Sequence, residues 1–213
     1  MGNLPTKEEM DSALRKRAGA VLQARFSDAT VAVCGLGGLG SHIAEALARA
    51  GIGTLILLDF DRVDVTNLNR QQYKASQIGM EKAQALAANL REIAPYLNIV
   101  AHTVRVTEDN AKQLLAEADV VCEAFDAAEQ KSMLVNAVME QMPEKYLVAA
   151  SGMAGLGSAN SVKTRKIASR FYLCGDGISD VAELGSLFAP RVMLCAAQQA
   201  LTVLRILAGQ FEI

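Results

Sequence analysis

The stretch Gly35-Leu-Gly-Gly-Leu-Gly40 constrains the fold of this chain more than any other feature. It follows a short apolar run rich in β-branched residues, Thr30–Cys34, and precedes an Ala- and Leu-rich helical pattern from about Leu39 to Ala50. Glycines at a strand-to-helix turn let the backbone approach a phosphate chain closely, and the helix N-terminus offers it free N–H groups. The sequence therefore predicts a phosphate-binding loop within a βαβ unit.

An acidic residue stands where such a unit holds a ribose. The second predicted strand, Thr54–Leu58, ends at Asp59. A carboxylate at this place accepts hydrogen bonds from ribose hydroxyls in nucleotide-binding folds. Asp59 therefore favours a nucleotide ligand over the alternative that the glycines only permit tight packing of the helix on the strand.

Strand-like and helix-like segments alternate along the rest of the chain. Each crossover helix must pack back onto the sheet, so this alternation predicts an α/β fold with a doubly wound, mainly parallel, Rossmann-like sheet. The remaining strands are predicted at 99–104, 119–122 and 146–150, and the helices at 79–93, after Thr107 and from Asp126, as a cap with Glu129, to before Pro143.

The N-terminal segment precedes this pattern. Thr6 and Glu9 have the spacing of a capping box, which predicts a helix within residues 1–28. No stretch has the composition of a domain linker, so we expect one domain over residues 1–213, with the nucleotide-binding core and a C-terminal addition in residues 29–213.

The C-terminal addition is predicted to be antiparallel. The segments 161–164 and 170–174 have the pattern of a hairpin, after a glycine-rich turn. A last helix starts at Pro190 and stays apolar to Leu207.

Charge and composition exclude several classes of function. The 213 residues carry 21 Lys+Arg and 23 Asp+Glu, a net charge of -2, so no basic field holds nucleic acid or an anionic membrane. The cysteines, Cys34, Cys122, Cys174 and Cys195, lack paired C-x-x-C spacing, which argues against zinc and for reduced thiols. No apolar stretch reaches the length of a membrane span. We therefore expect a cytoplasmic protein with no zinc, no membrane contact and no nucleic-acid partner.

A plain dinucleotide-binding domain does not explain the segment 59–72, Asp-Phe-Asp-Arg-Val-Asp-Val-Thr-Asn-Leu-Asn-Arg-Gln-Gln. Together with the glycine loop, the Gly-x-x-Lys motif that ends at Lys82 and the later Asp126, this segment resembles the ThiF/MoeB family. These are adenylyltransferases that activate ubiquitin-like sulfur carrier proteins, and they are related to ubiquitin-activating enzymes. The resemblance covers residues 10–210 as motifs in order and is greatest to short ThiF-like proteins of thiamine biosynthesis.

The resemblance implies ATP-dependent adenylylation of the C-terminal glycine carboxylate of a ThiS-like carrier protein, forming an acyl-adenylate and pyrophosphate in thiazole biosynthesis. Arg70 and Lys82 would neutralise the triphosphate, Asn67 and Gln71 would add neutral hydrogen bonds, and Asp126 would bind Mg²⁺. The catalytic residues would be Arg70, Lys82 and Asp126. The residues implied to hold ATP are Gly35, Gly37, Gly38, Leu39, Gly40, Asp59, Asp61, Asn67, Arg70, Gln71, Lys82, Arg15 and Arg17.

Two further expectations come from the resemblance. An N-terminal arginine of one subunit, Arg15 or Arg17, would reach the ATP phosphates of the other in a homodimer. The chain length leaves no room for a sulfurtransferase domain, so a separate protein would donate sulfur. Cys174, beside a glycine at a predicted strand end, is the one thiol whose position suits sulfur transfer, but a structural role is favoured because no neighbouring base is evident in the sequence. The other cysteines are predicted to be inert core residues.

Each assignment has an alternative. Arg70 taken alone also fits an ion pair with Asp61 or Asp64, Lys82 a solvated lysine, and Asp126 a helix N-cap. The alternative functions are an NAD-dependent oxidoreductase, a related enzyme acting on a small molecule or a modified tRNA base, and a nucleotide-binding module without turnover. The oxidoreductase leaves the arginine, the lysine and the later aspartate unexplained.

Overall fold

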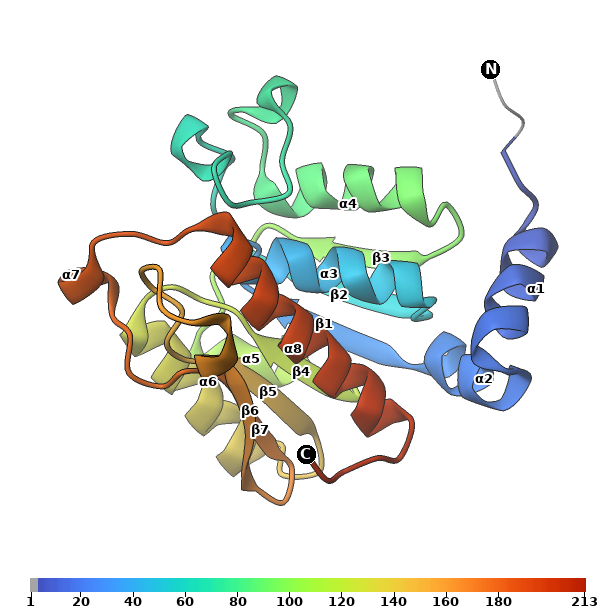
Figure 1. Ribbon diagram of the computed structural model, residues 1–213. Helices are drawn as coiled ribbons and strands as arrows, with labels where there is room; N and C mark the ends of the chain where they lie inside the picture. The colour runs from blue at the N-terminus through green and yellow to red at the C-terminus, as the bar shows by residue number, and fades with distance from the viewer. Residues whose placement is uncertain (1–3) are drawn as a thin grey trace.

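A seven-stranded sheet runs through the computed structural model, which describes residues 4–213 (Figure 1). Its strands are β1 (Thr30–Cys34), β2 (Thr54–Leu58), β3 (Asn98–His102), β4 (Val120–Glu123), β5 (Tyr146–Ala150), β6 (Lys163–Ala168) and β7 (Phe171–Gly175). They lie in the order β3-β2-β1-β4-β5-β7-β6, with every neighbouring pair parallel except β6 and β7. The doubly wound, mainly parallel prediction and the antiparallel C-terminal addition are confirmed.

Helices cover both faces of this sheet (Figure 1). Helices α3, α4 and α8 pack on one face, and α5 and α6 pack on the other. The helices are α1 (Lys7–Ala18), α2 (Ala20–Asp28), α3 (Gly38–Ala50), α4 (Lys82–Ile93), α5 (Glu108–Leu114), α6 (Ala128–Gln141), α7 (Val181–Leu184) and α8 (Ala189–Leu207). Within residues 4–213, none of them is both long enough and apolar enough to cross a membrane.

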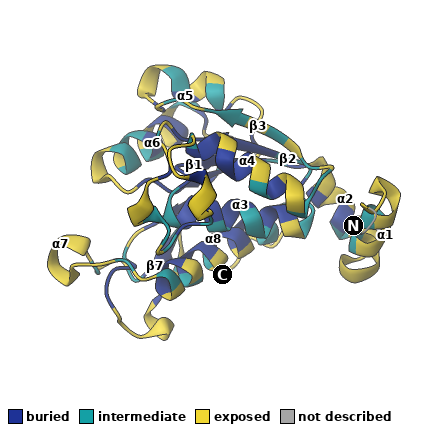
Figure 2. Ribbon diagram, turned by 90° about the horizontal axis from the view of Figure 1, so that it is seen from above, coloured by how far each residue is buried: buried dark blue, intermediate teal, exposed yellow. Residues whose placement is uncertain are grey.

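The central strands are apolar on both sides because both sides are covered. In β1, Val31 and Val33 belong to the core beneath α3 and α8, whereas Ala32 and Cys34 belong to the core beneath α5 and α6. This explains the unbroken apolar runs of the sequence, which are typical of parallel strands buried on both faces. Figure 2 shows these strands fully buried and α1 and α7 almost entirely exposed.

The N-terminal segment forms two helices rather than one. The predicted capping box is present, since Thr6 Oγ1 accepts from the Glu9 N–H at 3.2 Å and Glu9 Oε2 accepts from the Thr6 N–H at 2.7 Å. The helix then stops at Gly19, whose φ of +87° ends α1 before α2 begins. The helix predicted within residues 1–28 is therefore divided in two at Gly19.

Helix α6 begins without the predicted cap. The N-cap is Ala127, and Asp126 makes no capping hydrogen bond. The turn out of β4 is held from the other side, because Glu123 Oε1 accepts from the Phe125 N–H at 2.7 Å. The Asp126 carboxylate is therefore left exposed and available for another partner.

Candidate functional site

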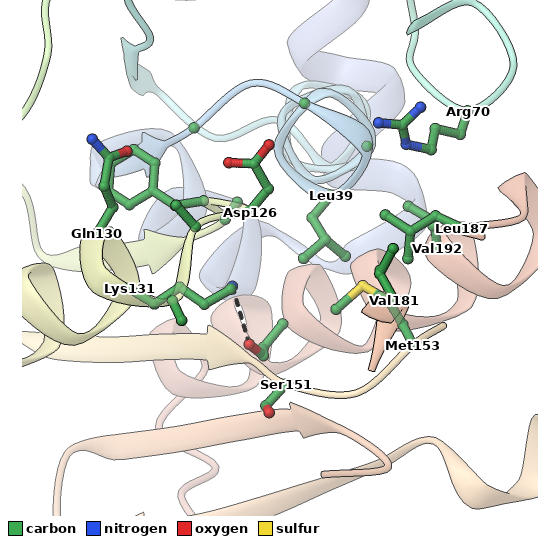
Figure 3. Close-up of a pocket in the computed structure, with 18 of the residues that line it drawn as sticks. Leu39, Arg70, Asp126, Gln130, Lys131, Ser151, Met153, Val181, Leu187 and Val192 are labelled. Carbon is green, nitrogen blue, oxygen red and sulfur yellow. Dashed lines mark hydrogen bonds between the residues drawn. The ribbon is translucent and has the colours of Figure 1, made fainter. Parts of the chain in front are cut away.

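A pocket of ≈ 480 Å³ opens at the carboxyl ends of the parallel strands. It lies where the chain leaves β1 toward α3 and leaves the neighbouring β4 toward α6, which pack on opposite faces of the sheet. Ligands of doubly wound folds bind at such a switch point. The volume suits a nucleotide-sized ligand. Figure 3 shows the side chains that surround it.

The four glycines of the loop serve two purposes. Gly35 has a φ of +89° and a Cβ there would lie 2.7 Å from the Ala124 carbonyl oxygen, while a Cβ on Gly40 would lie 1.8 Å from the Gly35 carbonyl oxygen. These two glycines are required for packing. For them, the alternative that the glycines permit tight packing of the helix on the strand is correct. Gly37 is less crowded, since a Cβ there would lie 3.7 Å from Gln71 Nε2, an ordinary contact, and as N-cap of α3 it supplies no side-chain cap. The first N–H groups of α3 thus face the pocket, where an anion would satisfy them.

Asp59 is fixed at the pocket wall by two backbone hydrogen bonds. Its Oδ2 accepts from the Leu36 N–H at 2.6 Å and its Oδ1 from the Asp61 N–H at 2.8 Å. Burial raises the pKa of the Asp59 carboxyl, and the charge of Lys82 opposes that rise. Each oxygen retains a lone pair, so the carboxylate still has acceptors for ribose hydroxyls.

Lys82 is the first residue of α4 and points into the pocket wall. Its Nζ donates to Asp61 Oδ2 at 2.8 Å, and its side chain is 8% exposed. The solvated-lysine alternative is therefore wrong. The helix starts three residues later than predicted because Gly79, with a φ of +86°, still belongs to the turn before it.

Arg70 and Gln71 bring unpaired polar atoms to the pocket. Arg70 Nη1 donates to Asn69 Oδ1 at 2.9 Å, but its Nε is buried without a partner, and so is Oε1 of Gln71. Within residues 4–213, Arg70 forms no ion pair with Asp61 or Asp64, the partners of the structural alternative. Buried polar groups without hydrogen-bond partners are costly, so they mark a place where a ligand would supply the missing partners.

Asp126 follows β4 on the opposite side of the pocket from Arg70, with its carboxylate directed toward the glycine loop (Figure 3). It is exposed, and within the described chain it has no hydrogen bond or ion pair of its own. The part of the chain that the structure describes holds no cluster of three or more His, Cys, Asp or Glu side chains near one another. A lone carboxylate of this kind fits Mg²⁺ that takes its other ligands from nucleotide phosphates and water.

The profile of the ThiF family matches residues 10–213. This chain belongs to the ThiF family. It is 40% identical over 112 residues to tRNA threonylcarbamoyladenosine dehydratase of Escherichia coli, covering 52% of this chain and 42% of that protein. It is 36% identical over 126 residues to a sulfur carrier protein adenylyltransferase of Thermus thermophilus, covering 57% and 46%. The chain thus spans less than half the length of these curated relatives.

A solved structure has the same fold. The crystal structure of the E. coli tRNA N6-threonylcarbamoyladenosine dehydratase in complex with ATP superimposes with a TM-score of 0.85 over 98% of each chain, at 23% identity. The expected family resemblance is confirmed.

Two of the residues expected to hold ATP, Gly40 of the glycine loop and Asn67, do not line the pocket. Asn67 Oδ1 accepts from the Asp64 N–H at 3.0 Å, which closes the capping box of a short 3-10 helix, Val65–Asn67. In this structure Asn67 shapes the loop that carries Arg70 rather than facing a ligand.

Arg15 and Arg17 lie far from the pocket of their own chain. Both are exposed on α1, and the neighbouring Leu14 lies against Gly51, at the end of α3 remote from the pocket. Helix α3 separates Gly51 from the glycine loop by about 20 Å. The expectation that one of these arginines reaches the site of a partner subunit stays a prediction.

Cys174 is buried, which agrees with the favoured structural role and not with a thiol that is reachable for sulfur transfer. Its side chain is 0% exposed, and its Sγ lies 3.4 Å from Thr164 Oγ1. Burial raises the pKa of the thiol. The reason is long-range: β7 lies between β5 and β6 and beneath α8, instead of ending an exposed hairpin. The predicted burial of the remaining cysteines, Cys34, Cys122 and Cys195, is confirmed.

Beyond Asp59 the pocket is bordered by an arginine on an aromatic ring. The Arg105 guanidinium carbon lies 4.1 Å from the centre of the Phe60 ring, and both residues line the pocket. Sequence reasoning missed this pair because it joins the end of β2 to the loop after β3. Phe60 directly follows Asp59, the carboxylate predicted to bind a ribose, and this adjacency is the sequence signal that points to it.

An ion pair lies under the pocket and was also not predicted from the sequence; its carboxylate is buried and its lysine is partly exposed. Lys131 of α6 lies 3.1 Å from each carboxylate oxygen of Glu123 at the end of β4, and Glu123 is 1% exposed. Burial raises the pKa of the Glu123 carboxyl, against the lowering effect of Lys131. A charged residue that closes an apolar strand, as Asp59 does in β2, is the sequence signal that would have found it.

A second buried ion pair holds the loops at the pocket mouth. Arg191 of α8 donates to Asp176 and, at 2.7 Å and 2.9 Å, to the carbonyl oxygens of Gly157 and Ser158. Burial alone would raise the pKa of Asp176, but hydrogen bonds from Ser179 and its neighbour, with that from Arg191, lower it to about 2. This pair ties together two segments that border the pocket.

Proposed function

We propose that this protein is an ATP-dependent adenylyltransferase, which transfers AMP from ATP to a carboxylate and releases pyrophosphate. The observation that carries the proposal is the set of unpaired polar groups around the uncapped N-terminus of α3. Arg70 Nε and Gln71 Oε1 are buried there without partners, and Asp126 faces them across the pocket. A triphosphate would accept from the Arg70 guanidinium and the α3 N–H groups, and its cation would be bound by Asp126.

Each side chain has a defined part in this reaction. The Gly37 turn and the first N–H groups of α3 bind phosphate oxygens, while Arg70 and Lys82 neutralise negative charge as pyrophosphate leaves. Asp59 orients the ribose, and the base then lies beyond it, toward Phe60. Mg²⁺, held through the later aspartate of the pocket, would supply further charge neutralisation on the phosphates.

An apolar wall borders the pocket below Arg70 in the view of Figure 3. This side is free for the carboxylate substrate, next to the phosphate-binding loop. We propose that the substrate is the C-terminal glycine of a ThiS-like carrier protein in thiamine biosynthesis, that the enzyme is a homodimer, and that a separate protein donates sulfur. The likeness to a sulfur carrier protein adenylyltransferase supports a carrier substrate. The wall is formed by Leu39, Met153, Val181, Leu187 and Val192.

A tRNA substrate is the second candidate. It is supported by the 40% identity to tRNA threonylcarbamoyladenosine dehydratase. That modified base keeps the carboxylate of its threonine, so the same adenylylation chemistry applies to it. The net charge of -2 disfavours it, because tRNA binding relies on basic surfaces. Membership of the ThiF family favours either acceptor over an NAD-dependent oxidoreductase.

The test is exchange of radioactive pyrophosphate into ATP by the purified chain. It is run with a ThiS-like carrier ending in Gly-Gly, with tRNA bearing threonylcarbamoyladenosine, and with no acceptor. We expect exchange only with the carrier, and a loss of about 100-fold or more in Arg70→Ala and in Asp126→Ala. Exchange without an acceptor, or exchange that survives both substitutions, contradicts the mechanism. Exchange with tRNA alone selects the second candidate, and tight NAD binding without ATP binding selects the oxidoreductase.

A further inference from the structure

Strands β4 and β5 part before they reach the pocket. Their parallel register runs from Val120 opposite Tyr146 to Cys122 opposite Val148 and stops there. Each strand continues to pair with its other neighbour to its end. The carboxyl ends of β4 and β5 are therefore joined by no direct ladder under the pocket floor.

Two side chains from opposite faces of the sheet bridge this gap. Gln199 of α8 donates from Nε2 to the carbonyl oxygens of Glu123 and Val148, at 3.0 Å and 3.2 Å. From the other face, Lys131 of α6 donates to the Glu123 carboxylate and to the Ala150 carbonyl oxygen at 3.2 Å (Figure 3). Side chains thus replace the missing backbone hydrogen bonds at this edge.

Each of the three N–H donors of the Lys131 ammonium has an acceptor within the protein. An ammonium has three donors, and its three acceptors are the two Glu123 oxygens and the Ala150 carbonyl. Lys131 lines the pocket, yet its charge is matched by a carboxylate beneath it. It therefore differs from Arg70, whose Nε is unpaired, and has no donor left for a phosphate.

The same carboxylate controls the backbone next to Asp126. Glu123 Oε1 accepts the Phe125 N–H at 2.7 Å, and Lys131 anchors α6 five residues after Asp126. Asp126 itself makes no hydrogen bond in the described chain that would hold it in place. Its position over the pocket follows from the two anchors on either side of it.

We propose that Glu123 and Lys131 are positioning residues that hold Asp126 at its place opposite the glycine loop and set the spacing between the ends of β4 and β5. This inference rests on the proposed function. A buried ion pair contributes little stability compared with apolar residues of similar size, so stability alone gives no reason for charges here. A fixed carboxylate in a pocket that handles Mg²⁺ and phosphates does give one.

The experiment compares variants that lose this pair with a matched control. The double variant Glu123→Leu with Lys131→Met removes both charges together, so no buried charge is left unpaired. The single variant Lys131→Arg keeps a positive charge opposite Glu123, so it should retain part of the activity that the double variant loses. Lys145→Met is the control. Lys145 is also a largely buried lysine, and it donates to two carbonyl oxygens, those of Ala116 and Ala118 at 2.7 Å and 2.8 Å, but at the opposite end of β4.

We measure thermal unfolding, the affinity for ATP with and without Mg²⁺, and kcat and KM of exchange. The double variant is expected to fold and to bind ATP without Mg²⁺ within about twofold of the wild type. It is expected to need at least about 10-fold more Mg²⁺ for half-maximal effect and to lose about 10- to 100-fold in kcat, with partial rescue in Lys131→Arg. Lys145→Met is expected to lower the unfolding temperature and leave kcat unchanged.

A double variant with the Mg²⁺ requirement and kcat of the wild type overturns the inference. So does an equal loss of kcat in Lys145→Met, since the effect is then purely structural. Failure of the wild type to exchange pyrophosphate with any acceptor contradicts the proposed function instead. The Mg²⁺ dependence of ATP affinity, which needs no acceptor, still tests the pair in that case.

Discussion

Lys82 is joined to Asp61 twice: its backbone N–H donates to the Asp61 carbonyl oxygen at 2.9 Å, and its Nζ donates to Asp61 Oδ2 at 2.8 Å. The first contact sets the start of α4, and the second aims the ammonium along the pocket wall. The lysine side chain is 8% exposed, whereas that of the aspartate is 47% exposed. The charge of Lys82 is thus held at the pocket by the loop that also carries Asp59.

Removal of that charge tests its role in catalysis. Lys82→Met is expected to lower kcat/KM for pyrophosphate exchange by about 100- to 1,000-fold, as loss of a charge-stabilising donor does. Asp61→Asn keeps the ammonium and removes only the negative charge of its partner, so a smaller loss is expected. Activity of Lys82→Met within twofold of the wild type would show that the lysine takes no part.

Gly35 is expected to tolerate no side chain. In Gly35→Ala the φ of +89° costs about 1–2 kcal/mol, and the contact of Cβ with the Ala124 carbonyl oxygen adds overpacking of about 1–3 kcal/mol. Gly79→Ala is the control, since its φ is +86° and nothing lies within 4 Å of its Cβ. Urea unfolding should show a loss of about 2–5 kcal/mol for the first and only about 1–2 kcal/mol for the second. Equal losses would mean that the conformation alone, and not the packing, demands glycine at Gly35.

Asp176 is expected to make stability depend on pH in the acid range. Its folded pKa of about 2 lies below the ordinary 3.8, so the folded state holds the proton less tightly than the unfolded chain. This contribution, about 2 kcal/mol, is present above pH 4 and is lost as the pH falls toward 2. Asp176→Asn should therefore be less stable than the wild type at pH 7 by about 2 kcal/mol, and the difference should shrink below pH 4.

The matched control for this titration is Asp180→Asn. Asp180 is the exposed N-cap of α7, and Asn caps a helix as well as Asp does. Urea unfolding of both variants across this pH range makes the comparison. A difference between wild type and Asp176→Asn that stays constant from pH 7 to pH 3 contradicts the assignment.

The cysteines are expected to be unreactive in the folded protein. All four thiols are buried, and burial raises the pKa of Cys174 as it does those of the others. A thiol reagent should label them slowly until guanidinium exposes all four. Cys174→Ala should retain pyrophosphate exchange within about twofold. Rapid labelling of native Cys174 would restore its candidacy for sulfur transfer.

Local sequence determined the nucleotide-binding half of the site. Strands β1 and β2, the glycine loop and Asp59 were all predicted because their signals lie within a few residues: an apolar run, a turn that only glycine allows, and a carboxylate at a strand end. The repeated alternation of such units was enough to predict the parallel sheet.

Tertiary structure decided what the other side chains do. Cys174 is buried because β7 lies between β5 and β6, and Asp126 caps no helix because α6 begins one residue later, with Ala127 as its N-cap. The Lys131 contact with Ala150 joins a helix to a strand that follows it. Burial and hydrogen-bond partners depend on which segments the packed sheet brings together, whereas periodicity reports only what adjacent residues prefer.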